Sequence, residues 1–202
     1  MRLGIFGGSF NPPHNIHLKI AEYLINQNYV DKVIYVPTGS KYQYKNNLLA
    51  PKHRLNMLKL LINNNHNLSI STYELQSRPI YTYETLTHFK NKYPNDTIYF
   101  ICGMDNLDYL DKWYKGLEIL KNFKLMVIKR NHQMYSNLFE KYHKYLNNIT
   151  LVEFPEESIS STMIRNNILN NKDNTKYLKP SIIEYITKNN LYKKEEEICK
   201  KL

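Results

Sequence analysis

An apolar strand, a glycine-containing turn and a helix follow one another in the first 26 residues. Leu3–Phe6 is an apolar run, two glycines follow it, and apolar side chains recur at helical spacing over residues 15–26. His14 and His17 stand three residues apart at the head of this helix, so both imidazoles fall on roughly one face. Glycines let backbone N–H groups approach a ligand closely, and a helix N-terminus presents free N–H groups to an anion. The segment predicts a phosphate-binding strand–loop–helix; a plain strand–turn–helix with incidental histidines is the alternative.

Short apolar runs and helical patterns alternate along the rest of the chain. Further strands are expected at 32–36, 68–72, 97–102, 124–128 and 150–153, and further helices from 51 and at 82–92, 161–170 and 180–189. Thr82 is expected to cap the helix at 82–92. The alternation is typical of a parallel sheet with crossover helices, so we predict one doubly wound, Rossmann-like α/β domain over 1–202, with 190–202 a solvated C-terminal tail. Ligands of such sheets bind beyond the carboxyl ends of the strands, where the glycine loop, Thr38 and Gly103 should converge.

The chain of 202 residues carries a formal net charge of +10, which favours polyanionic partners such as a nucleoside triphosphate or nucleic acid. A basic nucleic-acid-binding module is the alternative from another functional class, but it requires clustered basic residues, whereas the lysines here are scattered. Cys102 and Cys199 are too few for a disulfide framework and lack metal-ligand spacing, so a reducing compartment and no protein metal site are expected. No apolar run approaches the roughly 20 residues that span a bilayer. We therefore expect a cytoplasmic protein that binds neither nucleic acid nor membranes.

A second phosphate-binding pattern lies near the C-terminus. Ser160, Ser161 and Thr162 open a predicted helix, and Arg165 follows one turn later on nearly the same side as Thr162. Free N–H groups, hydroxyls and a guanidinium can together hold the oxygens of a triphosphate. Alone, such a pattern is more often an ordinary helix N-terminus with a solvated arginine, so its weight comes from its occurrence with the histidine-containing loop.

The two patterns resemble the signature motifs of the nucleotidyltransferase α/β-phosphodiesterase superfamily. Its Gly-x-Phe-x-Pro-x-His-x-Gly-His loop is matched at Gly8, Phe10, Pro12, His14 and His17. Its Ile-Ser-x-Thr-x-x-Arg motif is matched by residues 159–165. One position differs, because Ile16 stands where the family usually has glycine, and this leaves the local backbone geometry open.

Within this superfamily, the chain resembles the bacterial-type nicotinate mononucleotide adenylyltransferases over most of its length. The matching stretches are 51–58, 81–86, 100–107, 113–115, 177–180 and 190–192. The resemblance implies a His-x-Gly-His-type nucleotidyltransferase fold and transfer of AMP from ATP to nicotinate mononucleotide in NAD biosynthesis, with deamido-NAD and pyrophosphate as products. An acceptor phosphate oxygen would attack the α-phosphorus directly, so alignment and charge stabilisation, by His14, His17 and Arg165, would supply the catalysis. Mg²⁺ would arrive bound to ATP.

The resemblance also implies which residues bind each substrate. For ATP they are Gly7, Gly8, Ser9, Phe10, His14, His17, Gly103, Asp105, Ser160, Ser161, Thr162 and Arg165. For the mononucleotide they are Gly8, Ser9, Thr38, Lys41, Lys45, Tyr81, Thr82, Trp113 and Tyr114. In the family, the tryptophan that corresponds to Trp113 stacks on the nicotinate ring, and backbone amides near Tyr81–Thr82 and Tyr114 receive its carboxylate. Core packing is the alternative role for Trp113.

The acceptor side departs most from the family pattern. Relatives carry a Pro-Pro-His-Lys-like segment where this chain has residues 39–45, so Lys41, Tyr44 and Lys45 are alternatives for contact with the mononucleotide phosphate. Ile80 also replaces a small polar residue, which leaves nicotinamide mononucleotide open as the preferred acceptor. A phosphopantetheine adenylyltransferase or a cytidylyltransferase would share the fold, but the Trp113–Tyr114 segment argues against both. A homo-oligomer is also compatible with the sequence.

Overall fold

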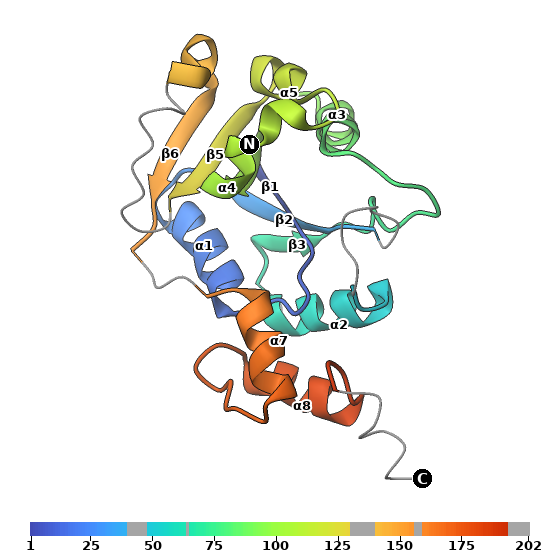
Figure 1. The fold of residues 1–202 in the computed structure, drawn as a ribbon. Coiled ribbons are helices and arrows are strands. Elements are labelled where there is room, and N and C mark those ends of the chain that lie inside the picture. The colour runs from blue at the N-terminus through green and yellow to red at the C-terminus, as the bar shows by residue number, and fades with distance from the viewer. Residues whose placement is uncertain (40–47, 64, 130–139, 156–158, 194–202) are drawn as a thin grey trace.

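Within the part of the chain that the structure describes, six parallel strands form the centre of the fold (Figure 1). The structure is a computed structural model that describes residues 1–39, 48–63, 65–129, 140–155 and 159–193. The strands are β1 (Arg2–Gly8), β2 (Lys32–Pro37), β3 (Leu68–Ile70), β4 (Thr97–Gly103), β5 (Lys124–Lys129) and β6 (Ile149–Glu153). They lie in the order β3-β2-β1-β4-β5-β6, and each neighbouring pair is parallel. The predicted doubly wound α/β sheet is confirmed.

The strands are apolar on both faces because the sheet is covered on both sides. In β1, Leu3 and Ile5 belong to one buried cluster and Phe6 belongs to the other. In β4, Phe100 and Ile101 divide between the same two clusters. This explains why the sequence of β4 is a nearly continuous apolar run rather than an alternating one.

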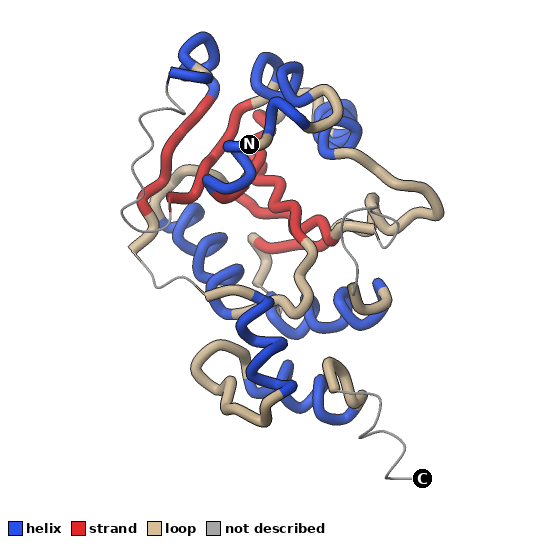
Figure 2. The backbone as a smooth tube through the Cα atoms, viewed as in Figure 1, coloured by secondary structure: helices blue, strands red, loops and turns tan. Residues whose placement is uncertain are grey.

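Helices cover both faces of the sheet, and Figure 2 shows them on either side of the strands. They are α1 (Asn15–Asn26), α2 (Pro51–Ile62), α3 (Thr82–Lys92), α4 (Met104–Asp108), α5 (Gly116–Asn122), α7 (Ser161–Leu169) and α8 (Pro180–Lys188), with 3-10 helices η1 (Leu110–Lys112) and η2 (His143–Asn148). Helices α1, α2, α7 and α8 contribute to the cluster that contains Phe6, whereas α3, α4, α5 and η1 contribute to the cluster that contains Leu3. In the described ranges, no helix has the length and apolar character needed to cross a membrane.

The direction of chain connection reverses between β1 and β4. From β1 the chain proceeds to β2 and then to β3 at one edge, and it returns to β4 on the other side of β1. The register pairs Gly8 with Pro37 and Phe6 with Ile101, so the carboxyl ends of β1, β2 and β4 lie at the same edge of the sheet. Ligands of doubly wound folds bind at such a reversal, which places a candidate site beyond Gly8.

The elements between β4 and β5 were not predicted from the sequence. Helices α4 and α5 have five and seven residues, which is too short for an apolar period of 3.6 residues to repeat clearly. The expected cap of α3 is wrong by one residue, because the N-cap is Tyr81, whose N–H donates to Oε2 of Glu84 at 2.9 Å. The strand expected at 68–72 ends at Ile70.

The start of the expected solvated tail is packed onto the domain. Leu191 is 7% exposed and belongs to the cluster that contains Phe6. The Tyr192 hydroxyl donates to Oδ1 of Asn11 at 2.9 Å. The prediction of a solvated segment is therefore wrong for these two residues, because each has a partner far away in the sequence. Residues 194–202 lie outside the described residues.

Candidate active site

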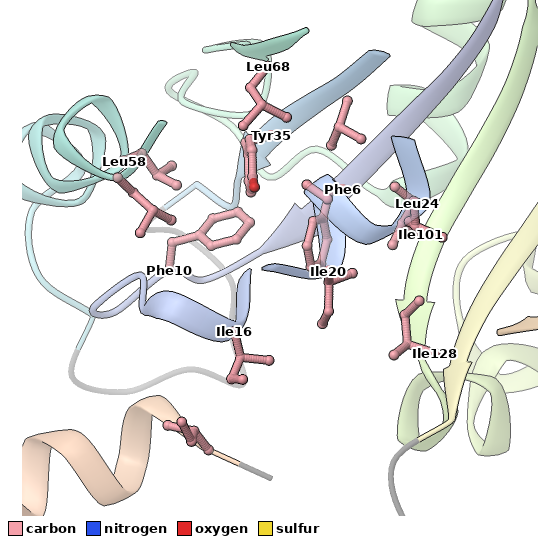
Figure 3. Packing of buried hydrophobic residues seen from close by; sticks show 14 of the residues in the cluster. Phe6, Phe10, Ile16, Ile20, Leu24, Tyr35, Leu58, Leu68, Ile101 and Ile128 are labelled. Carbon is pink, nitrogen blue, oxygen red and sulfur yellow. The ribbon is translucent and has the colours of Figure 1, made fainter. Parts of the chain in front are cut away.

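A buried aromatic ring supports the loop between β1 and α1. Phe10 is 2% exposed, and its ring packs against Phe6 and Tyr35 at centroid distances of 5.9 and 5.6 Å (Figure 3). It also packs against His17, with ring centroids 5.0 Å apart. A Cβ at Gly8 would lie 3.0 Å from the Phe10 ring, so any larger residue there would force the ring to shift by a few tenths of an ångström. Phe10 has φ 48°, in the left-handed region that bulky residues rarely adopt. Burial of its side chain thus stabilises a loop conformation that its backbone does not favour.

The two histidines face one another at the start of α1. Their ring centroids are 3.8 Å apart, and the backbone N–H of His14 donates to Nδ1 of His17 at 3.1 Å. Because Nδ1 of His17 accepts this hydrogen bond, the proton of its neutral imidazole lies on Nε2. The Nε2–H group is then a donor suited to a phosphate oxygen. Ile16, which replaces the family's glycine, is 3% exposed and lies within regular α1, so the helix accommodates it.

The second motif is in direct contact with this loop. The Ser161 hydroxyl donates to the carbonyl of Pro12 at 2.8 Å, and Nη1 of Arg165 donates to the carbonyl of Asn11 at 2.8 Å. Nη2 of Arg165 donates to Oγ1 of Thr162 at 3.1 Å. Ser160 is the N-cap of α7, and its Oγ accepts the N–H of Met163 at 3.1 Å. The structure therefore brings together the predicted histidine-containing and arginine-containing segments.

Sequence reasoning missed a buried arginine beneath the loop. Arg54 of α2 is fully buried and donates to the carbonyls of Leu49, Ser9 and Thr38 at 3.0, 2.9 and 2.6 Å. Thr38 in turn donates to the Gly8 carbonyl, from its N–H at 2.9 Å and its hydroxyl at 2.8 Å. Burial lowers the pKa of Arg54, and the negative charge of the Glu74 carboxylate opposes this effect. The guanidinium thus ties together the segments that follow β1 and β2.

Three of the predicted acceptor residues, Tyr81, Trp113 and Tyr114, gather on the face of the sheet that carries the cluster containing Leu3. The Trp113 ring packs edge-to-face on Phe100 of β4, with centroids 6.3 Å apart. Phe100 Cε2 would lie 3.6 Å from a Cβ at Gly7, so Trp113 is linked through one ring to the end of β1. The rings of Tyr81 and Tyr114 are 4.9 Å apart. The segments that contain Thr82 and Trp113 therefore lie beside one another at this face.

Lys115 was not singled out from the sequence, yet it lies within the acceptor group. Its Nζ is 4.7 Å from the Tyr83 ring centroid and 5.6 Å from that of Tyr114. A cation held over two aromatic rings is attracted to their faces, which limits its freedom. The side chain therefore places a positive charge next to Tyr83 and Tyr114.

Two predicted residues lie at the carboxyl end of β4. Gly103 is the last residue of this strand, and the exposed Asp105 follows in α4. The Asp105 carboxylate lies over Gly103, where any added Cβ would collide with Oδ1.

Lys41 and Lys45 lie outside the described residues, so their expected contact with the mononucleotide phosphate stays a prediction.

The described donors suit phosphate oxygens rather than a divalent cation. His14, His17 and Arg165 bring N–H groups and a positive charge to the loop, whereas Mg²⁺ requires oxygen ligands. Among the described residues, no group of three or more His, Cys, Asp or Glu side chains is arranged to hold a metal ion.

Comparisons with known proteins agree with this fold. The sequence profile of the cytidylyltransferase-like family matches residues 5–167. The chain also has a parallel sheet of this strand order and a histidine-containing loop in contact with an arginine-containing helix. Together with the family match, these features identify the chain as a nucleotidyltransferase.

Individual relatives that match nearly the whole chain show which family of nucleotidyltransferases it belongs to. A probable nicotinate-nucleotide adenylyltransferase of Caldicellulosiruptor bescii is 37% identical over 96% of this chain and 100% of its own length. The nicotinate-nucleotide adenylyltransferase of Bacillus subtilis is 35% identical over 95% of this chain and 98% of its own length. The chain belongs to the nicotinate-nucleotide adenylyltransferase family. The solved structure of Plasmodium falciparum nicotinic acid mononucleotide adenylyltransferase complexed with NaAD superposes with a TM-score of 0.81, at 28% identity over 95% of this chain and 97% of that chain.

Proposed function

We propose that the protein transfers AMP from MgATP to the 5′-phosphate of nicotinate mononucleotide, giving deamido-NAD and pyrophosphate. The observation that carries this proposal is the contact between the two motifs, in which Ser161 and Arg165 hold the loop that leads to His14 and His17. The activity for which the relatives are named, and the NaAD bound to the P. falciparum enzyme, support the same reaction. Because ATP and the mononucleotide are cytoplasmic metabolites, we place this activity in the cytoplasm.

The chemistry requires no protein nucleophile. An oxygen of the acceptor phosphate forms a bond to the α-phosphorus of ATP, and the bond from that phosphorus to the pyrophosphate oxygen breaks. Negative charge increases on the leaving pyrophosphate, so preorganised donors in this region stabilise the transition state. We assign this role to Nε2–H of His17, to His14 and to the remaining N–H groups of the Arg165 guanidinium.

The mononucleotide would approach the carboxyl ends of the strands from the face of the sheet on which Trp113 lies. In this proposal the Trp113 indole stacks on the pyridine ring, and backbone N–H groups near Thr82 and Tyr114 receive the carboxylate. The two substrates then meet over Gly7–Ser9, where backbone can approach both phosphates closely.

Pyrophosphate release from ATP and Mg²⁺ tests the function when each mononucleotide is offered separately. We expect rapid release with nicotinate mononucleotide and slow release with the amide. Faster turnover of the amide would reassign the acceptor. Absence of release with either mononucleotide, from folded protein, would refute the proposed function.

A further inference from the structure

The chain segment after α8 ends against the phosphate-binding loop. Asn190 and Tyr192 both have left-handed backbones, with φ 48° and 64°, and Leu191 between them is buried. Such a conformation is unfavourable for a tyrosine and persists where the surroundings impose it. The fixed backbone therefore indicates that the Tyr192 side chain has a specific place.

That place is beside Asn11, at the centre of the loop. The Tyr192 hydroxyl donates to Oδ1 of Asn11 at 2.9 Å, and Asn11 is 3% exposed. The same Oδ1 accepts the N–H of Leu49 at 3.3 Å. The backbone carbonyl of Asn11 accepts Nη1 of Arg165 at 2.8 Å. One residue of the loop thus links the tyrosine hydroxyl to the arginine that we assign to the triphosphate.

Burial keeps the Tyr192 hydroxyl protonated and therefore a hydrogen-bond donor. Burial raises the pKa of Tyr192, while the positive charges of Arg165 and Arg54 act in the opposite direction. The phenol remains protonated at neutral pH, so it can donate to Asn11 throughout the working range.

We propose that Tyr192 is a positioning residue for adenylyl transfer, which orients Asn11 and, through its carbonyl, the Arg165 guanidinium. The inference rests on the proposed function, and it gives a role to a C-terminal segment that contacts neither nucleotide in that proposal. It predicts that the hydroxyl affects the ATP side of the reaction and leaves the acceptor side unchanged.

The test compares two tyrosine-to-phenylalanine variants of the full chain. Tyr192→Phe removes only the hydroxyl that reaches Asn11. Tyr185→Phe is the matched control, because its hydroxyl accepts from Asn56 and contacts His53 at 3.0 Å, away from the loop. We expect Tyr192→Phe to lower kcat/KM for ATP about fivefold, as loss of one buried hydrogen bond can do. The Kd for nicotinate mononucleotide, measured by fluorescence of the single tryptophan, Trp113, should not change.

A double-mutant cycle with Asn11→Ala distinguishes action through Asn11 from a general loss of stability. If Tyr192 acts through Asn11, the two fold-losses in kcat/KM will not multiply. Losses that multiply, equal losses in Tyr192→Phe and Tyr185→Phe, or wild-type kinetics in Tyr192→Phe would each overturn the inference. A wild-type enzyme that fails to adenylylate nicotinate mononucleotide would instead refute the proposed function.

Discussion

Nη1 of Arg165 donates to the backbone carbonyl of Asn11 at 2.8 Å, across 154 positions of sequence. This contact, with that of Ser161 to Pro12, joins the N-terminal loop to α7. A guanidinium has five N–H donors in a planar fork, and two of its nitrogens are engaged by Asn11 and Thr162. The group is therefore held in place while other N–H groups remain for a ligand.

Replacement of His17 should reduce catalysis far more than stability. His17→Ala removes the Nε2–H donor, and we expect kcat/KM to fall by about 10²–10³, as for loss of other transition-state donors. His17→Gln is the matched variant, because its amide nitrogen can occupy the place of Nε2 and should restore part of the rate. Steady-state kinetics and circular dichroism measure the two effects. Full activity in His17→Ala would remove the histidine from the mechanism.

Arg54 should be required for stability. Arg54→Met leaves three backbone carbonyls, of Ser9, Thr38 and Leu49, without their buried donor. We expect the free energy of unfolding to fall by about 3 kcal/mol. Urea denaturation measures the change, with Lys52→Met on the exposed face of the same helix as the control. Equal stability of the two variants would show that the buried guanidinium does not hold the loops together.

Trp113 should act on the acceptor alone. Trp113→Ala removes the ring proposed to stack on the pyridine, so KM for nicotinate mononucleotide should rise about tenfold while KM for ATP stays unchanged. Trp113→Phe keeps an aromatic face and should lose less. A parallel rise in both KM values would indicate instead that Trp113 serves only to pack against Phe100.

Lys115 should contribute to preference for the acid over the amide. Its charge is held beside Tyr114, near the proposed carboxylate position, and Lys115→Gln removes it. We expect the ratio of kcat/KM values for the two mononucleotides to fall about threefold at low salt, since the side chain is exposed and screened. Lys112→Gln is the matched control, because Lys112 lies over Tyr109 at 5.2 Å. An unchanged ratio in Lys115→Gln would assign acid recognition to the backbone alone.

The features predicted from sequence are those with a local physical cause. The strands and most helices follow from apolar periodicity, and the loop from glycines next to a helix start. Arg54 was missed because arginine is seldom fully buried. Its position three and four residues before Met57 and Leu58 places it on the buried face of the same helix, and this spacing could have revealed it. The packing of Tyr192 on Asn11 depends on a partner 181 positions away, which no local pattern reveals. The side-by-side position of Tyr81 and Tyr114 likewise arises only from tertiary structure.

A crystal structure of the protein with MgATP, or with an analogue that resists cleavage, tests most directly whether the two motifs share one triphosphate. We predict phosphate oxygens within hydrogen-bond distance of both Nε2 of His17 and the guanidinium of Arg165. A triphosphate bound to one of these side chains and remote from the other would contradict the account.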